Sequence, residues 1–240
     1  HEGIRDNFVT VSGNTRTSIT VIDQTSGVLT RLLEPGPRVS RKDIRQLKEK
    51  LSSLVRRASY VVFSGRNVPG APENIYSDLI RFTRSMGKKA VLDTSGKGLF
   101  FGLKARPYLV KPNRQEAQFI LRRPLKTLAG LREALRHFTR MGIQVALISL
   151  GGQGAAVSDG KEFWLAQPPR VKATNTVGCG DALLAGFLYG RLRRRSLAES
   201  LRLAVATGTS NAMSLQPGYF NPFKAGILAA RIRLTDMEST

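Results

Sequence analysis

Asn175-Thr176-Val177-Gly178-Cys179-Gly180-Asp181 is followed at once by an apolar run, ALLAGFLYG, over residues 182–190. The two glycines permit a sharp turn and a close approach of the backbone to a ligand. The apolar run predicts a buried helix, so the turn lies at a helix N-terminus, where free amides and the helix dipole favour an anion. On spacing alone, a carboxylate that only compensates this dipole is the simpler explanation of Asp181.

Short apolar runs alternate with segments of helical spacing before this turn. The expected strands are 60–63, 90–93, 108–111 and 145–150, and the expected helices are about 41–56, 72–86, 113–121 and 127–141. A hairpin over 155–158 and 162–166 and helices near 180–192, 197–213 and 222–233 follow. The alternation predicts an α/β fold with a mostly parallel sheet and helices on both of its faces.

A small β element is expected ahead of these units, over about residues 8–33. Residues 8–22 alternate as strands do around the turn Ser12-Gly13-Asn14-Thr15, and residues 26–33 complete an antiparallel unit. No internal repeat or linker interrupts the sequence, so we expect residues 1–240 to form a single domain. A second copy of the chain is expected to pair through the exposed edges of this element.

The charge balance is strongly basic, with 38 Lys and Arg against 17 Asp and Glu and a net charge of +21. Such a field attracts anions, among them sugar phosphates, nucleotides and nucleic acids. The densest cluster, Arg191 and residues 193–195, follows an expected helix end and is explained as a solvated terminus. Because no nucleic-acid motif accompanies it, we expect no nucleic-acid partner, although the charge leaves one open.

Few residues offer redox or soft-metal chemistry. The single Cys179 forms no disulfide within the chain, which favours the cytoplasm or another reducing compartment. Together with His1 and His137 it gives no zinc-site spacing, so a bound metal would be a hard cation with oxygen ligands. No apolar run approaches the roughly 20 residues that span a bilayer, and we expect no membrane partner.

Residues 175–190 resemble the C-terminal signature of the ribokinase-like (PfkB) carbohydrate kinases. They are most similar to the phosphosugar branch, which contains 1-phosphofructokinase-like and tagatose-6-phosphate kinase-like enzymes. The resemblance implies a ribokinase-like fold whose β element is a lid. It also implies that Asp181 is the catalytic base and that the amides of Gly178, Cys179 and Gly180 form an anion hole for the transferring phosphate.

Two further segments match the nucleotide half of that family in the expected order. Asn113 and Glu116 in VKPNRQE resemble its Asn-x-x-Glu motif, which implies that they position Mg²⁺, mostly through water. Taken alone, an ordinary helix start, with Asn as cap and Glu at the third position, is the simpler explanation. Ser149, Gly151, Gly152 and Gly154 in SLGGQG resemble its nucleotide-contacting turn, for which a tight hairpin entry is the alternative. The implied cosubstrate is ATP; a P-loop is absent.

The sugar half matches less completely. Arg16 in GNTR resembles the lid arginine that would pair with the phosphate already on the sugar, and a plain exposed hairpin charge is the alternative. Ser64 and Gly65 begin a segment similar to the family's sugar-site turn, but Arg66 and Asn67 replace small or apolar residues there. Asp93 stands at a strand end facing the same crevice and is the fourth expected substrate-binding residue.

The resemblance implies ATP-dependent phosphorylation of a hydroxymethyl group of a ketohexose monophosphate. Fructose 1-phosphate, giving fructose 1,6-bisphosphate, is the preferred acceptor, with tagatose 6-phosphate and fructose 6-phosphate as alternatives. In this family a strand–helix region precedes the lid, and the sequence begins inside or just before the lid, so we expect an N-terminally incomplete domain. A catalytically impaired relative that serves binding or assembly is the alternative from another class.

Overall fold

A seven-stranded sheet forms the centre of the protein in the computed structural model, which describes residues 3–23, 25 and 29–238. Its strands, in spatial order, are β3 (Tyr60–Ser64), β4 (Lys89–Asp93), β5 (Leu109–Val110), β6 (Val145–Ser149), β7 (Ala155–Ser158), β8 (Phe163–Gln167) and β9 (Arg233–Asp236). Strands β3 to β6 are parallel, and β6 to β9 are antiparallel to their neighbours. The predicted mostly parallel α/β architecture is therefore confirmed, with an antiparallel extension.

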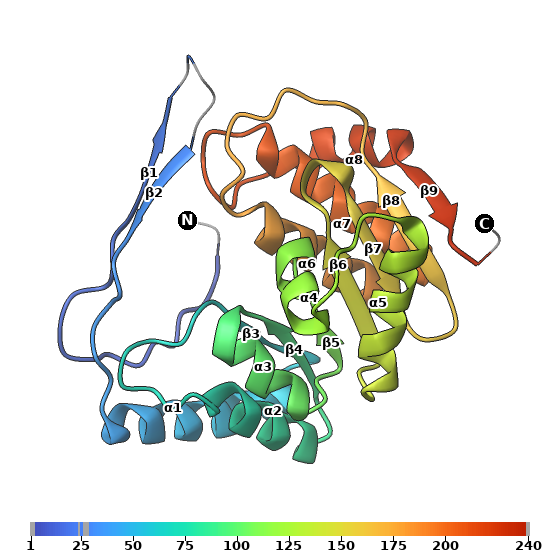
Figure 1. Ribbon diagram of the computed structural model, residues 1–240. Coiled ribbons are helices and arrows are strands. Elements are labelled where there is room, and N and C mark those ends of the chain that lie inside the picture. Colours follow the sequence, from blue (N-terminus) through green and yellow to red (C-terminus); the bar gives the residue numbers. More distant parts are fainter. Residues whose placement is uncertain (1–2, 24, 26–28, 239–240) are drawn as a thin grey trace.

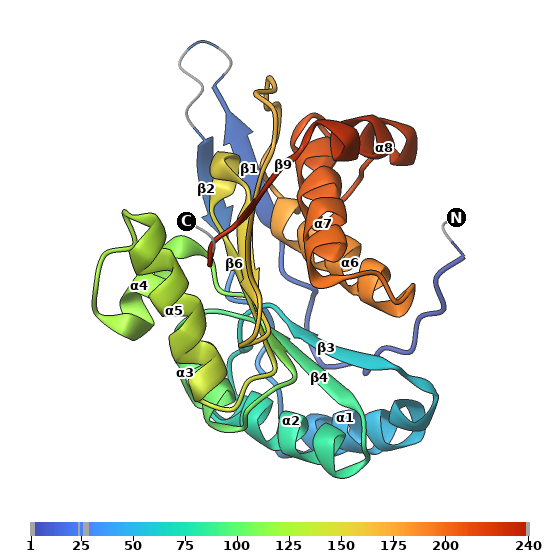
Figure 2. The same ribbon diagram turned by 90° about the vertical axis from the view of Figure 1, so that its right-hand side faces the viewer.

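Helices cover both faces of this sheet, as predicted. One layer contains α1 (Arg41–Leu54), α2 (Ile75–Ser85), α3 (Gly96–Lys104), α4 (Arg114–Leu121) and α5 (Leu128–Arg140), and the other contains α6 (Cys179–Leu192), α7 (Leu197–Ala212) and α8 (Pro222–Arg231). Short 3₁₀ turns occupy Val55–Arg57 and Gly151–Gln153. Figures 1 and 2 show the two layers on opposite sides of the strands. None of the described helices is long and apolar enough to cross a membrane.

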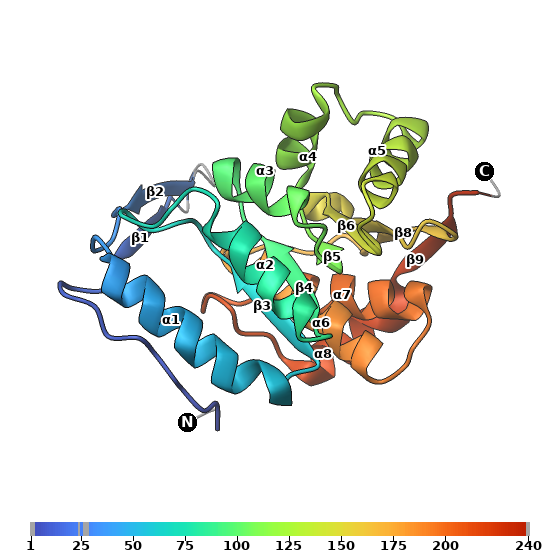
Figure 3. The same cartoon turned by 90° about the horizontal axis from the view of Figure 1, so that it is seen from below.

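Alternate residues of each central strand supply the two cores. In β4, Leu92 faces the layer of α2 to α5, whereas Val91 faces α6 to α8. In α5, Leu131, Leu135 and Phe138 recur at helical spacing and are buried against the sheet. Figure 3 shows α1 alongside α2, where Lys48 pairs with Asp78 across the two helices at 4.0 Å.

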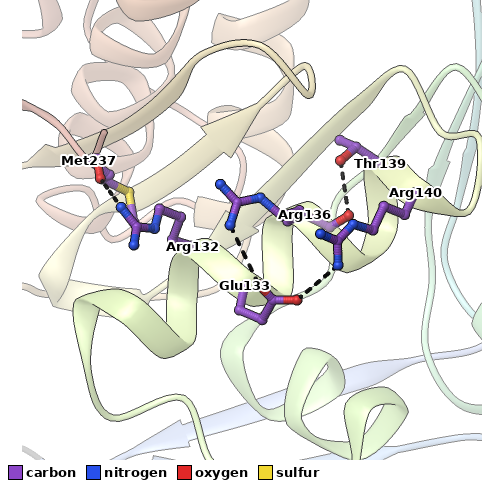
Figure 4. Close-up of polar contacts among 6 residues, drawn as sticks. All are labelled: Arg132, Glu133, Arg136, Thr139, Arg140 and Met237. Carbon is purple, nitrogen blue, oxygen red and sulfur yellow. Dashed lines mark hydrogen bonds and ion pairs between the residues drawn. The ribbon is translucent and has the colours of Figure 1, made fainter. Parts of the chain in front are cut away.

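The strand β9 was not predicted, because the expected last helix ran to residue 233. That helix ends at Arg231, and β9 adds to β8 in antiparallel register. Arg132 of α5 donates to the carbonyl oxygen of Met237 at 3.0 Å, just beyond the strand. On the outer side of α5, Glu133 pairs with Arg136 and Arg140, which leaves Arg132 for this contact (Figure 4). The contact spans 105 residues of sequence, so no local pattern could indicate it.

The small β element, expected to be a lid, is a two-stranded antiparallel ribbon of β1 (Ser18–Ile22) and β2 (Leu29–Leu33), which stands apart from the main sheet in Figure 1. The predicted strand over residues 8–11 is wrong: this segment is irregular, because β2 pairs along its whole length with β1 alone. Of the predicted 26–33 strand, residues 26–28 lie outside the described residues.

Helix α3 was also missed, since three of its nine residues are glycines, which have low helix propensity. Packing explains why glycine is needed there. A Cβ atom on Gly102 would lie 2.6 Å from Cδ2 of Leu92, so glycine lets the helix lie close to β4 without displacing that side chain. Tertiary packing thus overrides local propensity in this segment.

The close packing of α6 against α7 depends on Gly186, which a substitution can test. A Cβ atom on Gly186 would lie 2.2 Å from Oγ1 of Thr207. We expect Gly186→Ala to lower the free energy of unfolding by about 1–3 kcal/mol, because overpacking outweighs the gain in helix propensity. Gly226→Ala in α8 is the matched control: its Cβ meets nothing within 4 Å, and we expect a gain of up to about 1 kcal/mol in urea unfolding. Equal effects at the two positions would contradict the packing argument.

Candidate active site

The turn before α6 is held in place by buried contacts. Asn175 is buried; its side-chain amide donates to Leu215 O at 2.9 Å, and its Oδ1 accepts from Val177 N at 3.0 Å. Gly178 is the N-cap of α6 with φ of 81°, and a Cβ atom there would lie 2.4 Å from Gly218 N. Both the backbone conformation and the close approach therefore require glycine. The turn presents the N-terminus of α6 in a fixed geometry.

Asp181 lies in the first turn of α6 and is exposed. Within the part of the chain that the structure describes, no lysine or arginine forms an ion pair with it. Its negative charge helps to raise the pKa of Asp93, so it acts electrostatically on the carboxylate at the end of β4. A carboxylate that is exposed, without a cationic partner and beside a helix N-terminus is suited to accept a proton from a bound hydroxyl group.

A buried ion pair lies directly beside this helix start. Nζ of Lys111 is 2.9 Å from Oδ1 of Asp93, and the two side chains are only 6% and 14% exposed. The same Nζ would be 3.3 Å from a Cβ atom on Gly180, so the ammonium group faces the first turn of α6. Burial raises the pKa of Asp93 and Lys111 opposes that shift, while Asp181 and Glu116 raise the pKa further.

This pair changes what was expected of Asp93. The structure places the residue at the end of β4, as predicted, but its carboxylate is engaged by Lys111. Lys111 itself was not among the site residues expected from the sequence. Its signal was a lysine directly after the apolar strand residues Leu109 and Val110, at the edge where the other polar strand ends gather.

The predicted nucleotide turn and the predicted anion hole border one cavity of about 590 Å³. Its lining includes Ser149, Gly151, Gly152, Gly154, Cys179 and Gly180. The two sets come from segments well apart in the sequence, and the fold brings them together across the ends of β6 and α6. The cavity continues along apolar residues of α6 and α7, among them Leu183 and Val205, which suits a planar base.

The glycines of this turn divide into two kinds. A Cβ atom on Gly154 would lie 1.9 Å from Ala166 O, so this glycine is required by the approach of β8, as the hairpin alternative proposed. A Cβ atom on Gly151 or Gly152 would meet nothing within 4 Å, so these two glycines face open space. Close approach of a ligand to the backbone is therefore available at Gly151 and Gly152 rather than at Gly154.

Asn113 and Glu116 form a capping box at the start of α4. Asn113 Oδ1 accepts from Glu116 N, and Glu116 Oε2 accepts from Asn113 N, both at 2.8 Å. The helix-start explanation therefore holds. It is compatible with a second role, because Asn113 forms an isolated parallel β-bridge with Ser149, beside the nucleotide turn. Among the residues described, no group of three or more His, Cys, Asp or Glu side chains is arranged to hold a metal ion.

The predicted sugar-side residues gather at the ends of β3 and β4. Gly65 N donates to Asp93 O at 3.0 Å, and Gly65 O accepts from Thr94 Oγ1 and Tyr76 OH at 2.6 and 2.9 Å. Burial raises the pKa of Tyr76, and the charge of Arg16 opposes this shift. The Arg16 side chain is exposed and lies beside Gly36, where an added Cβ atom would be 3.6 Å from Arg16 Cβ. Tyr76 was not anticipated, since its position inside α2 follows an ordinary apolar pattern.

These groups share one edge of the molecule. Ser64, Asp93 and Ser149 end their strands, and Lys111 directly follows β5, so all four lie at the carboxyl edge of the parallel strands. Open α/β sheets bind ligands in the crevice outside this edge. The arrangement combines a nucleotide-sized cavity, a helix N-terminus, a buried cation and an exposed carboxylate.

The model of the pfkB family carbohydrate kinases matches residues 1–222. The chain is 32% identical over 204 residues to a 1-phosphofructokinase of Vibrio cholerae, an alignment that covers 85% of this chain and 64% of the relative. It is 29% identical over 237 residues to a tagatose-6-phosphate kinase of Staphylococcus epidermidis, an alignment that covers 98% of this chain and 76% of the relative. The chain thus spans about two thirds to three quarters of the length of these curated relatives.

Solved structures show the same architecture. Phosphofructokinase-2 from Escherichia coli in complex with potassium superimposes with a TM-score of 0.82 at 28% sequence identity. The superposition covers 90% of this chain and 70% of that chain.

Proposed function

We propose, from the premise that this chain belongs to the pfkB family of carbohydrate kinases, that its site transfers the γ-phosphoryl group of ATP to a hydroxymethyl group of a ketohexose monophosphate. The observation that carries the proposal is the start of α6. There an exposed carboxylate, Asp181, and a buried ammonium, Lys111, flank a glycine turn that opens into the nucleotide-sized cavity.

The chemistry follows from that geometry. With the nucleotide in the cavity, the amides of Gly178, Cys179 and Gly180 hold the terminal phosphoryl group, aided by the helix dipole. The acceptor hydroxyl oxygen attacks the γ-phosphorus while the bond from that phosphorus to the oxygen bridging to the β-phosphate breaks, which leaves ADP. Asp181 takes the hydroxyl proton. Lys111 adds positive charge beside Gly180, where negative charge is held during the transfer.

The carboxylate of Glu116 fits a hydrated Mg²⁺ ion. Its Oε2 accepts a hydrogen bond from the backbone N–H of Asn113, which leaves Oε1 for a water ligand. Its negative charge also helps to raise the pKa of Asp93. When bound with ATP, the ion would neutralise phosphate charge. Because Mg²⁺ keeps several waters and takes few protein ligands, the lack of a three-residue metal cluster among the described residues is compatible with this site.

Fructose 1-phosphate is the acceptor that we propose, with Arg16 pairing with the phosphate already on the sugar. The support is the 31% identity over 232 residues to a 1-phosphofructokinase of Escherichia coli, against 29% over 237 residues to the tagatose-6-phosphate kinase. In a coupled assay of ADP release we expect the highest kcat/KM with fructose 1-phosphate, compared with tagatose 6-phosphate and fructose 6-phosphate. A higher value with either alternative would overturn the substrate assignment. If none of the three sugars gave ADP release, the kinase function would be overturned and a binding or assembly role would be favoured.

The lid offers a surface for a second copy of the chain. Ile19, Val21 and Leu32 lie on one face of the ribbon, because Ile19 pairs with Leu32 in the β1–β2 register and Val21 is two residues from Ile19. Their side chains are 51%, 53% and 57% exposed. Escherichia coli phosphofructokinase-2, which is similar to this chain, has been solved in a tetrameric form. We propose that this chain forms a homodimer through the face of the lid that carries Ile19, Val21 and Leu32.

We expect Val21→Glu to shift the protein from dimer to monomer in light scattering after size-exclusion chromatography. A charge in an apolar contact costs several kcal/mol when it is unpaired. Thr20→Glu is the control, because Thr20 points to the opposite face of the same strand. A monomeric wild type, or an equal shift in both variants, would show that this face is not the dimer contact.

A further inference from the structure

A second cavity lies at the opposite edge of the sheet from the candidate active site. It has a volume of about 300 Å³, and its lining includes Arg84, Lys88, Lys89, Arg106, Tyr108 and Gln144. Lys89 is the first residue of β4, and Tyr108 and Gln144 directly precede β5 and β6. This cavity, which we call the basic hollow, therefore opens at the amino edge of the parallel strands.

The basic hollow concentrates positive charge without countercharge. Four of its lining residues are cations, and no carboxylate lines it. Across the described ranges of the chain, none of the four forms an ion pair with Asp or Glu. Like charges gathered in one concavity repel each other, and a bound anion relieves that repulsion.

Compensation of helix dipoles is the simpler explanation, because α2, α3 and α5 end at this edge. Each helix C-terminus carries about half a negative charge, so three of them offset about 1.5 positive charges. The hollow holds four cations, which leaves a surplus of about 2.5 positive charges by the same estimate. Helix capping therefore accounts for less than half of the charge.

Three of the cations are positioned by the fold. Arg84 Nη1 donates to Ala105 O at 2.7 Å, and Nζ of Lys89 lies 4.7 Å from the ring centroid of Tyr108. Arg106 adopts a left-handed backbone conformation with φ of 52°. Its side chain packs over Gly142, where an added Cβ atom would lie 3.1 Å from Arg106 Cδ. Such preorganisation lowers the entropy lost when a ligand binds.

We propose that the basic hollow binds a small anion that carries two or more phosphate groups. The surplus charge matches a ligand with two to four negative charges, and the volume corresponds to the small end of ligand pockets. Arg84 and Arg106 offer guanidinium groups, which bind phosphate oxygens in bidentate fashion. The proposal is independent of the kinase function, because it uses other residues at the other edge of the sheet.

Inorganic pyrophosphate is the probe for the test. The ¹⁵N-labelled protein is titrated with it at constant ionic strength and without Mg²⁺, and amide shifts are followed by NMR. We expect saturable shifts at Gly87, Lys88, Gly142 and Gln144, separate from any shifts at Gly152 and Gly180 that report binding at the candidate active site. No saturable shift in the hollow would overturn the proposal.

A matched pair of variants separates a specific site from the general charge of the protein. Arg106→Gly removes one cation and suits the backbone, since glycine favours this φ. Arg122→Gly makes the same change at φ of 51°, at the C-cap of α4 and outside the hollow. We expect Arg106→Gly to weaken pyrophosphate binding in the hollow about tenfold or more, and Arg122→Gly to leave it within about twofold. Equal weakening in both variants would overturn the proposal.

Discussion

Asp181→Asn is expected to lower the turnover of the phosphosugar by about 10²–10⁴-fold, the range typical of a lost general base. Asparagine has nearly the same shape and keeps the first turn of α6, but it does not accept the hydroxyl proton. Because Asp181 is exposed, the change should cost less than about 1 kcal/mol of stability, through the helix dipole alone. The coupled ADP-release assay measures kcat and KM separately, and we expect the loss in kcat.

Glu199→Gln provides the control for this prediction. Glu199 also lies in the first turn of a helix, α7, but it is outside the candidate site and pairs with Arg202 at 3.2 Å. Its substitution removes a carboxylate from a helix N-terminus without touching the cavity, so kcat should stay within about twofold. If both substitutions lowered kcat equally, Asp181 would be a dipole-compensating residue and no base.

Long periodic segments explain why most of the fold was predictable. The apolar run of β6 and the helical spacing of α5 each indicate an element with a face buried in the core, and the structure contains both elements as predicted. The failures came where tertiary contacts decide the structure. In helix α3, Gly102 allows close packing against Leu92. Strand β9 pairs with β8, and Arg132 donates to Met237 just beyond it.

The candidate site was predictable to a smaller extent, and the reason is similar. Residues 178–181 and 149–154 are contiguous motifs that carry their own geometry, and one cavity brings the two together. Lys111 and Asp93 are 18 residues apart and meet only because β4 and β5 are adjacent parallel strands. Each residue follows or ends an apolar strand in the sequence, but their pairing depends on strand order, which the local sequence does not indicate.

The capping box of Asn113 and Glu116 illustrates how two interpretations of one motif coexist. The hydrogen bonds between them are those of an ordinary helix start. The same bonds hold Glu116 at the edge of the site, where its charge acts on Asp93. Capping chemistry thus orients the carboxylate, and the proposed role in positioning Mg²⁺ uses the oxygen that capping leaves available.

Lys111→Met is expected to lower kcat by about 10²–10³-fold, as the loss of a preorganised electrostatic contact to the transferring phosphoryl group does. It should also lower the free energy of unfolding by about 3 kcal/mol, because the Asp93 carboxylate is left buried without its partner. Burial already raises the pKa of Asp93, so neutralisation of that carboxyl group absorbs part of this cost. Activity and stability therefore fall together in the single variant, which alone does not separate a direct role from a structural one.

The double variant Lys111→Met/Asp93→Asn separates the two roles. Removing both charges leaves no unpaired buried ion, so we expect urea unfolding to show that most of the lost stability returns. The ammonium group beside Gly180 is still missing, so kcat should stay about 10²-fold or more below that of the wild type. Recovery of both stability and kcat would show that Lys111 serves only as the partner of Asp93. Recovered stability with an unchanged KM and a kcat that stays low would assign the loss to a direct action of Lys111 on the phosphoryl group, whereas a raised KM would report the loss of Asp93 as a substrate-binding residue.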